Sequence, residues 1–240
     1  MVGFKKVPSL KECVKRDIPK IVKNHIIKSA YNLNIQWYVI CAGYSHCTSE
    51  EILTIQMERF REYLMEYSVW TDREEIFYLV LRGVDEGIMK VRRGWSKEKK
   101  HDQYMKVMEA VTLFTDTVKF PDLRSVNFGE IPRTIRYRIM EMIPSFTLLK
   151  VLIIGPGPGA GSWIPIKVDI SSSGNTILRS SCYQGKTASE LSSHISHLKH
   201  LEHFSLKKDC NMKILTSLVQ TCKEKLRILD VENSNYLQVR

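Results

Sequence analysis

The sequence predicts a mixed α/β fold. An α-helical N-terminal region is followed by a short solenoid, with parallel strands on the concave face and helices outside. Two observations predict it. A Leu-x-x-Leu-x-Leu spacing recurs through the second half of the 240-residue chain, and the apolar residues of the first half recur at helical spacing. We therefore expect a helical region over residues 1–119 and about four to five repeat units over residues 120–240.

Four segments carry the recurring spacing. The second follows the first by 26 residues, the fourth follows the third by 25, and 52 residues separate the second from the third. A degenerate copy around Ile177 and Leu178 would divide that longer interval. Recurrence at this period is typical of solenoids. The segments are Leu123-x-x-Val126-x-Phe128, Leu149-x-x-Leu152-x-Ile154, Leu201-x-x-Phe204-x-Leu206 and Leu226-x-x-Leu229-x-Val231.

Each repeat is expected to have a buried edge and an outward edge, because side chains alternate along a strand. The first, fourth and sixth positions point inward. A helix is expected after the third copy, with Ile214, Leu215, Leu218, Val219 and Cys222 at helical spacing. The outward positions either bind a protein or only keep the sheet soluble. They are Ser125, Asn127, Val151, Ile153, His203, Ser205, Lys207, Ile228, Asp230 and Glu232.

The stretch from His200 to Ser234 resembles the cysteine-containing leucine-rich repeats of F-box proteins and their insect relatives, with Cys210 after the strand and Cys222 before the next leucine. The resemblance covers residues 121–240. It implies a non-enzymatic protein-interaction module that recognises substrates for a ubiquitin ligase. The N-terminal half shows no F-box, and Leu10 precedes Cys13 by one position too few for the Leu-x-x-x-Cys core of elongin-binding boxes.

Proline positions, capping boxes and apolar spacing predict several helices in the first half of the chain. A helix is expected from Pro8, to bend or stop near Pro19. The capping boxes Thr48-x-x-Glu51 and Thr71-x-x-Glu74 open two more helices, and Ser96 caps another. Gly83 and Gly87 should weaken the second of these three helices near its end. The expected apolar faces are Leu53, Met57, Phe60 and Leu64 in the first helix; Ile76, Phe77, Val80, Leu81 and Val84 in the second; and Tyr104, Val107, Met108, Val111 and Val118 in the third.

A net charge of +10 raises an alternative function. Lys and Arg outnumber Asp and Glu by eight to two over residues 5–28 and by seven to two over residues 90–106. The alternative is a basic helical protein that binds nucleic acid or phosphoinositide through Lys97, Lys99 and Lys100, with the repeats as a structural extension. Aromatic stacking residues are not interleaved with these charges, so solvated helix faces are the favoured interpretation.

A glycine-rich segment follows the second repeat strand. Gly155, Gly157 and Ala160 satisfy a relaxed dinucleotide-binding fingerprint. Pro156 and Pro158 argue against it, because they remove two backbone N–H donors from a loop that would have to cradle phosphate. No cofactor is predicted.

Metal and catalytic patterns are weak as well. His194, His197, His200 and His203 recur at every third residue, but the first falls on an expected helix and the last on a strand. Cys41 and Cys47 lack a second ligand pair at zinc-site spacing. No nucleophile is paired with a base, so the chain is predicted not to be an enzyme and to hold no metal.

The composition predicts where the protein is located, and the last residues of the chain predict an incomplete repeat. Six scattered cysteines and the lack of a long apolar run favour the cytoplasm or nucleus and exclude a membrane span. The last repeat stops soon after Val231 without a helix or polar cap. We therefore expect a truncated product, or a repeat end that self-association covers.

Overall fold

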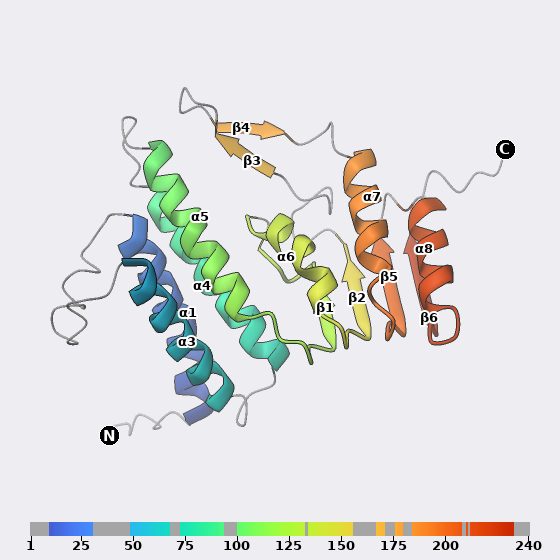
Figure 1. The fold of residues 1–240 in the computed structure, drawn as a ribbon, viewed down its shortest axis with the longest axis horizontal. Coiled ribbons are helices and arrows are strands. Elements are labelled where there is room, and N and C mark those ends of the chain that lie inside the picture. Colours follow the sequence, from blue (N-terminus) through green and yellow to red (C-terminus); the bar gives the residue numbers. More distant parts are fainter. Residues whose placement is uncertain are drawn as a thin grey trace, which may run out of the picture. The chain divides into compact units, whose positions relative to one another are not determined.

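A computed structural model describes residues 10–30, 49–67, 73–93, 100–132, 134–155, 167–170, 176–179, 184–207, 210 and 212–232. These residues form a mixed α/β structure, as predicted, and its elements are seven α-helices and six strands (Figure 1). The chain divides into two compact units, with the main boundary between Val118 and Lys119, and Lys100 and His101 group with the second unit. In the described part of the chain, no helix is both long and apolar enough to cross a membrane.

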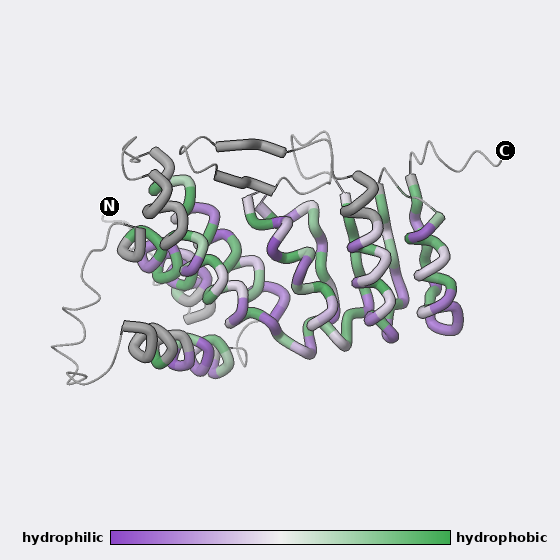
Figure 2. Tube along the Cα trace, turned by 45° about the horizontal axis from the view of Figure 1, so that its top comes forward, coloured by the Kyte–Doolittle hydropathy of each residue, from purple (hydrophilic) through white to green (hydrophobic). Residues whose placement is uncertain are grey.

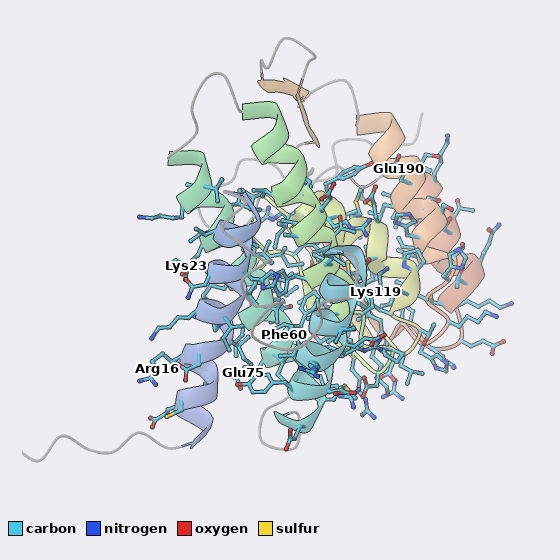
Figure 3. The ribbon with its side chains drawn as sticks, turned by 60° about the vertical axis from the view of Figure 1, so that its left-hand side comes forward. Arg16, Lys23, Phe60, Glu75, Lys119 and Glu190 are labelled. Atoms are coloured by element: carbon cyan, nitrogen blue, oxygen red, sulfur yellow. The ribbon has the colours of Figure 1, made fainter. Side chains whose placement is uncertain are left out.

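The described residues of the first unit form the helices α1 (Leu10–Ala30), α3 (Ser49–Tyr67), α4 (Arg73–Arg93) and α5 (Lys100–Thr117). Three of them meet at the buried ring of Phe114. Phe60 of α3, labelled in Figure 3, lies edge-to-face with it at a centroid distance of 5.5 Å. His25 of α1 does the same at 5.4 Å. This aromatic cluster joins helices that are far apart in sequence.

Helices α1 and α4 pack closely through two glycines. A Cβ on Gly83 would lie 2.7 Å from the Pro19 carbonyl oxygen and 2.7 Å from Val22 Cβ, and one on Gly87 would lie 2.8 Å from Ile26 Cβ. Helix α4 continues past both glycines to Arg93. Likewise α1 runs through Pro19 without stopping. The close contact between the helices offsets the low helix propensity of these residues.

Ion pairs flank this contact. Lys15 of α1 pairs with Glu75 of α4, and Lys23 Nζ lies 3.3 Å from Glu86 Oε2. Figure 3 labels Glu75 and Lys23, one member of each pair. All four side chains are partly exposed, so each pair contributes about 0–1 kcal/mol. Two lysines of the basic segment 5–28 are therefore matched by acids on the neighbouring helix.

The expected apolar faces are buried wherever their side chains are described, except that Met108 is only partly buried. The buried residues are Phe60, Leu64, Ile76, Phe77, Val80, Leu81, Val84, Val107, Val111 and Val118. Lying outside the described residues or side chains are Pro8, Thr48, Leu53, Met57, Thr71, Ser96 and Tyr104.

A four-stranded parallel sheet forms the core of the second unit. Its strands are β1 (Ser125–Asn127), β2 (Val151–Ile154), β5 (His203–Lys207) and β6 (Ile228–Glu232), in the spatial order β1-β2-β5-β6. Each strand begins at the third position of one Leu-x-x-Leu-x-Leu segment. The four segments therefore lie side by side, and their strand residues are in register.

The prediction of a degenerate repeat strand around Ile177 and Leu178 is wrong. Strand β4 (Thr176–Arg179) pairs with β3 (Lys167–Ile170) in a separate antiparallel sheet, where Ile177 lies opposite Asp169. Strand β2 pairs directly with β5 instead. Because β3 is only a few residues away, β4 can form a complete local ladder without entering the parallel sheet.

Helices connect the successive parallel strands. Helix α6 (Arg136–Met142), continued by the 3₁₀ turn η1 (Ile143–Ser145), precedes β2; α7 (Gln184–Ile195) precedes β5; and α8 (Met212–Cys222) precedes β6. These helices lie on one face of the sheet (Figure 1). Strand order equals chain order, so each connection steps in the same direction.

The turns that lead into the strands repeat the same hydrogen bonds. The Arg124 carbonyl accepts from the N–H groups of both Lys150 and Val151, at 2.8 and 2.9 Å. The Lys150 carbonyl accepts in the same way from the Glu202 and His203 amides, and the Glu202 carbonyl accepts from those of Arg227 and Ile228. The polar backbone of every strand entry is thus paired with the next one.

One row of fourth-position side chains crosses the sheet under the helices. Val126, Leu152 and Phe204 are all fully buried. Leu229, the last member of the row, lies on the edge strand β6 and is 47% exposed, unlike Val126 on the opposite edge strand β1. The residues expected at helical spacing after the third segment lie in helix α8. Ile214, Leu218 and Cys222 are buried, Leu215 is partly buried, and Val219 is exposed.

Gly83→Ala should destabilise the helical unit. Overpacking against Pro19 and Val22 costs about 1–3 kcal/mol, and alanine restores only about 1 kcal/mol of helix propensity. We expect a lower free energy of unfolding by urea titration. Exposed Met89→Ala in the same helix is the control and should change it little. A Gly83→Ala protein that is more stable than the parent would contradict the close α1–α4 contact.

Leu152→Ala and Leu229→Ala form a matched pair in one row of the sheet. Leu152→Ala should cost about 2–5 kcal/mol because it opens a cavity, whereas Leu229→Ala should cost about 1 kcal/mol or less because half of its surface already meets solvent. Urea denaturation measures both. Equal losses would mean that β6 is not the edge of the packed sheet.

Candidate functional site on the parallel sheet

The predicted binding residues form two rows on the sheet face opposite the buried row. The first row runs from Ser125 through Val151 and His203 to Ile228. The second row runs from Asn127 through Ile153 and Ser205 to Asp230. The structure therefore brings eight predicted residues from four separate segments onto one surface. Lys207 and Glu232 continue as a third row in register, but their side chains lie outside the described set.

Side chains of the second row are largely engaged within the protein. Asn127 Oδ1 accepts from the Gly129 N–H at 2.9 Å, and Asn127 Nδ2 donates to Glu130 Oε1 at 3.0 Å. Ser205 is 2% exposed, and its hydroxyl donates to Asp230 Oδ2 at 3.0 Å. Asn127 thus shapes the turn after β1, and Ser205 orients Asp230 rather than offering surface of its own.

The first row is more available to a partner. Ser125, Val151 and His203 are partly exposed, and Ile228 is 52% exposed. Among the described residues, no side-chain hydrogen bond engages Ser125 or His203. An exposed isoleucine beside polar neighbours is typical of a protein-binding surface, where an apolar anchor is surrounded by polar groups.

A charged cluster lies next to the first row, at the strand entries. Lys150 Nζ lies 2.6 Å from Glu202 Oε1 across the β2–β5 boundary. This hydrogen bond lowers the pKa of Glu202, and the positive charges of Arg227 and Lys225 lower it further. Lys225 Nζ also lies 3.2 Å from His200 Nδ1. One carboxylate is therefore surrounded by three basic side chains.

The structure separates the residues of the histidine series. His194 lies in α7 and His203 begins β5. Burial is the main cause that lowers the pKa of His194. Among the described residues, no group of three or more His, Cys, Asp or Glu side chains is arranged to hold a metal ion. Cys41, Cys47, Pro156, Gly157, Pro158 and Ala160 fall outside the described residues.

Two cysteines of the second unit are buried. Both Cys210 and Cys222 are fully or nearly fully buried, and Cys222 Sγ donates to the Leu198 carbonyl at 3.2 Å. Burial raises the pKa of the Cys210 thiol to about 11 and also raises that of Cys222. These thiols pack as small apolar groups and are poor nucleophiles at neutral pH.

Comparisons of the whole chain with protein-family models, with curated proteins and with solved structures found no match. The geometry of the sheet and its charges is therefore the basis of the functional argument.

Sequence reasoning missed the charged cluster at the strand entries. Lys150, Glu202 and Arg227 stand at the second position of their segments, immediately before each strand. The alternation of side chains assigned only the third, fifth and seventh positions to the outward face. The second positions could have been grouped with them, since the N-terminal ends of parallel strands meet at one edge.

Thiol labelling tests the buried cysteines. At pH 8 a maleimide reagent should modify partly exposed Cys13 faster than Cys210 or Cys222, as peptide mapping by mass spectrometry would show. The folded pKa of Cys210 exceeds its ordinary value of 9.0, so its contribution to stability is present below pH 9.0 and is lost as the pH rises toward about 11. Rapid labelling of Cys210 in the folded protein would contradict its burial.

Proposed function

We propose that the second unit is a short leucine-rich-repeat solenoid whose outward sheet face binds a protein, and that the chain is a non-enzymatic interaction module. The observation that carries this proposal is the first outward row, which gathers Ser125, Val151, His203 and exposed Ile228 from four separate segments. A surface with an apolar anchor among polar groups suits a protein epitope.

The repeat interpretation is supported by three regularities. Strand order follows chain order, the helices between strands lie on one face of the sheet, and the strand entries share one hydrogen-bond pattern (Figure 1). Burial is a further regularity, because the first, fourth and sixth positions are buried in the first three segments. Repeats that contact only their neighbours produce this arrangement.

The biological role that we propose is substrate recognition for a ubiquitin ligase in the cytoplasm or nucleus. Its support is the resemblance of residues 121–240 to the repeats of F-box proteins, in which Cys210 and Cys222 take the characteristic small positions. Both cysteines are buried as that repeat type requires. Recovery of a cullin adaptor with the tagged chain would be the direct sign of this role.

Ile228→Asp should abolish partner binding through the sheet. The residue is 52% exposed on the outward face, so a charge there should disturb the interface more than the fold. Tagged parent and variant proteins would be incubated with cell lysate, and co-purifying proteins quantified by mass spectrometry. Each recovered partner would then be purified and its binding measured by calorimetry.

Val219→Asp is the matched control. Val219 is 56% exposed on α8, in the helical layer, so the substitution adds the same charge at a similar exposure away from the outward row. It should leave binding unchanged. A partner lost equally with both variants, or with neither, would contradict the proposed surface. Partners whose recovery requires RNA and is unchanged by either substitution would favour the nucleic-acid alternative.

A further inference from the structure

The turns that lead into the four parallel strands form a basic edge of the sheet unit. These turns comprise residues 119–124, 147–150, 197–202 and 223–227, and they hold seven Lys or Arg against three Asp or Glu. Parallel strands all enter the sheet from the same side, so the four turns share one edge. The turn between α8 and β6 is strongly hydrophilic (Figure 2).

The register fixes the order of charges along this edge. Arg124, Lys150, Glu202 and Arg227 occupy equivalent positions, and the carbonyl of each of the first three accepts hydrogen bonds from the next entry. Neighbouring parallel strands are about 4.8 Å apart, so four entries span about 14 Å. An extended peptide of about five residues covers that length.

Internal pairing neutralises only part of the positive charge. Glu202 is in contact with Lys150 and lies within the field of Arg227 and Lys225. Arg227 and Lys225 are exposed, as are Lys199 and Lys223. The edge therefore keeps a local excess of positive charge that can attract an acidic ligand from solution.

Exposed apolar side chains lie in the same region. Leu148, in the turn before β2, is 43% exposed, and Ile228, directly after Arg227, is 52% exposed. The described residues of the four turns include no exposed Phe, Tyr or Trp on which a base could stack, and their exposed imidazoles are those of His197 and His200. Alternating basic and aliphatic groups fit a peptide that carries both carboxylates and apolar side chains better than they fit a nucleic acid.

We propose that this basic edge binds an acidic, partly apolar segment of a protein partner, with the carboxylates on Lys225 and Arg227 and an aliphatic side chain against Ile228. The inference rests on the proposed protein-binding function of the sheet and names the chemistry of the partner. Glu202 acts against binding, because it occupies the centre of the edge with the same charge as the ligand.

Fluorescence anisotropy with a labelled peptide tests this directly. The probe is an octapeptide of glutamate and leucine residues, and the comparison probes are the same peptide with glutamine for glutamate and a single-stranded oligouridylate. Lys225→Glu with Arg227→Glu should lower the affinity for the acidic peptide by about tenfold. Glu202→Gln should raise it by about threefold, a gain that unfolding cannot produce.

The control variant reverses two exposed lysines of the helical unit, Lys20→Glu with Lys90→Glu, and changes the net charge equally. It should leave peptide binding within a factor of about two. An equal loss in both double variants would overturn the proposal in favour of general charge attraction. Equal binding of the glutamine peptide, or tighter binding of oligouridylate through the edge, would also overturn it.

The proposed function can survive failure of this inference. If a purified partner is lost with Ile228→Asp but binds normally to Lys225→Glu with Arg227→Glu, the sheet binds a protein without help from the edge. If neither variant affects any partner, both the proposed function and the inference fail.

Discussion

The paired hydrogen bonds at the strand entries determine the arrangement of the second unit. Because the carbonyls of Arg124, Lys150 and Glu202 each accept from two amides of the next entry, neighbouring strands are held in one register. That register stacks Val126, Leu152 and Phe204 as one buried row and presents the third positions as one outward row. It also aligns charges that are 25 or more residues apart in the chain.

Burial and charge divide the surface of this unit into different roles. Asn127 and Ser205 lie on the outward face, but Asn127 hydrogen-bonds within the turn after β1 and Ser205 hydrogen-bonds to Asp230. These two side chains therefore stabilise the surface more than they recognise a ligand. The first row and the strand entries retain exposed apolar and basic groups. A ligand that crosses both would combine an aliphatic contact with charge pairing, which favours specificity and rapid association.

Periodicity in the sequence was sufficient to predict the helical first half and, in the first three Leu-x-x-Leu-x-Leu segments, the buried positions. It failed where the partner of a residue decides the outcome. Ile177 and Leu178 fit a repeat strand, yet β3 pairs with them locally. Pro19 and Gly83 each look like helix breakers, but they face one another and allow two helices to pack closely. Such matches depend on tertiary contacts that no local pattern contains.

A disulfide cross-link between β2 and β5 tests the central claim that the second and third segments are direct neighbours. Val151→Cys with His203→Cys would be oxidised in a protein whose Cys13, Cys41, Cys47 and Cys182 are replaced by serine. Register partners on adjacent strands lie about 4.8 Å apart, within the range that a disulfide spans. We expect the 151–203 cross-link by peptide mapping. Its absence, with cross-linking of Val151→Cys to Ile177→Cys instead, would place the 177 segment between the two strands and contradict the fold.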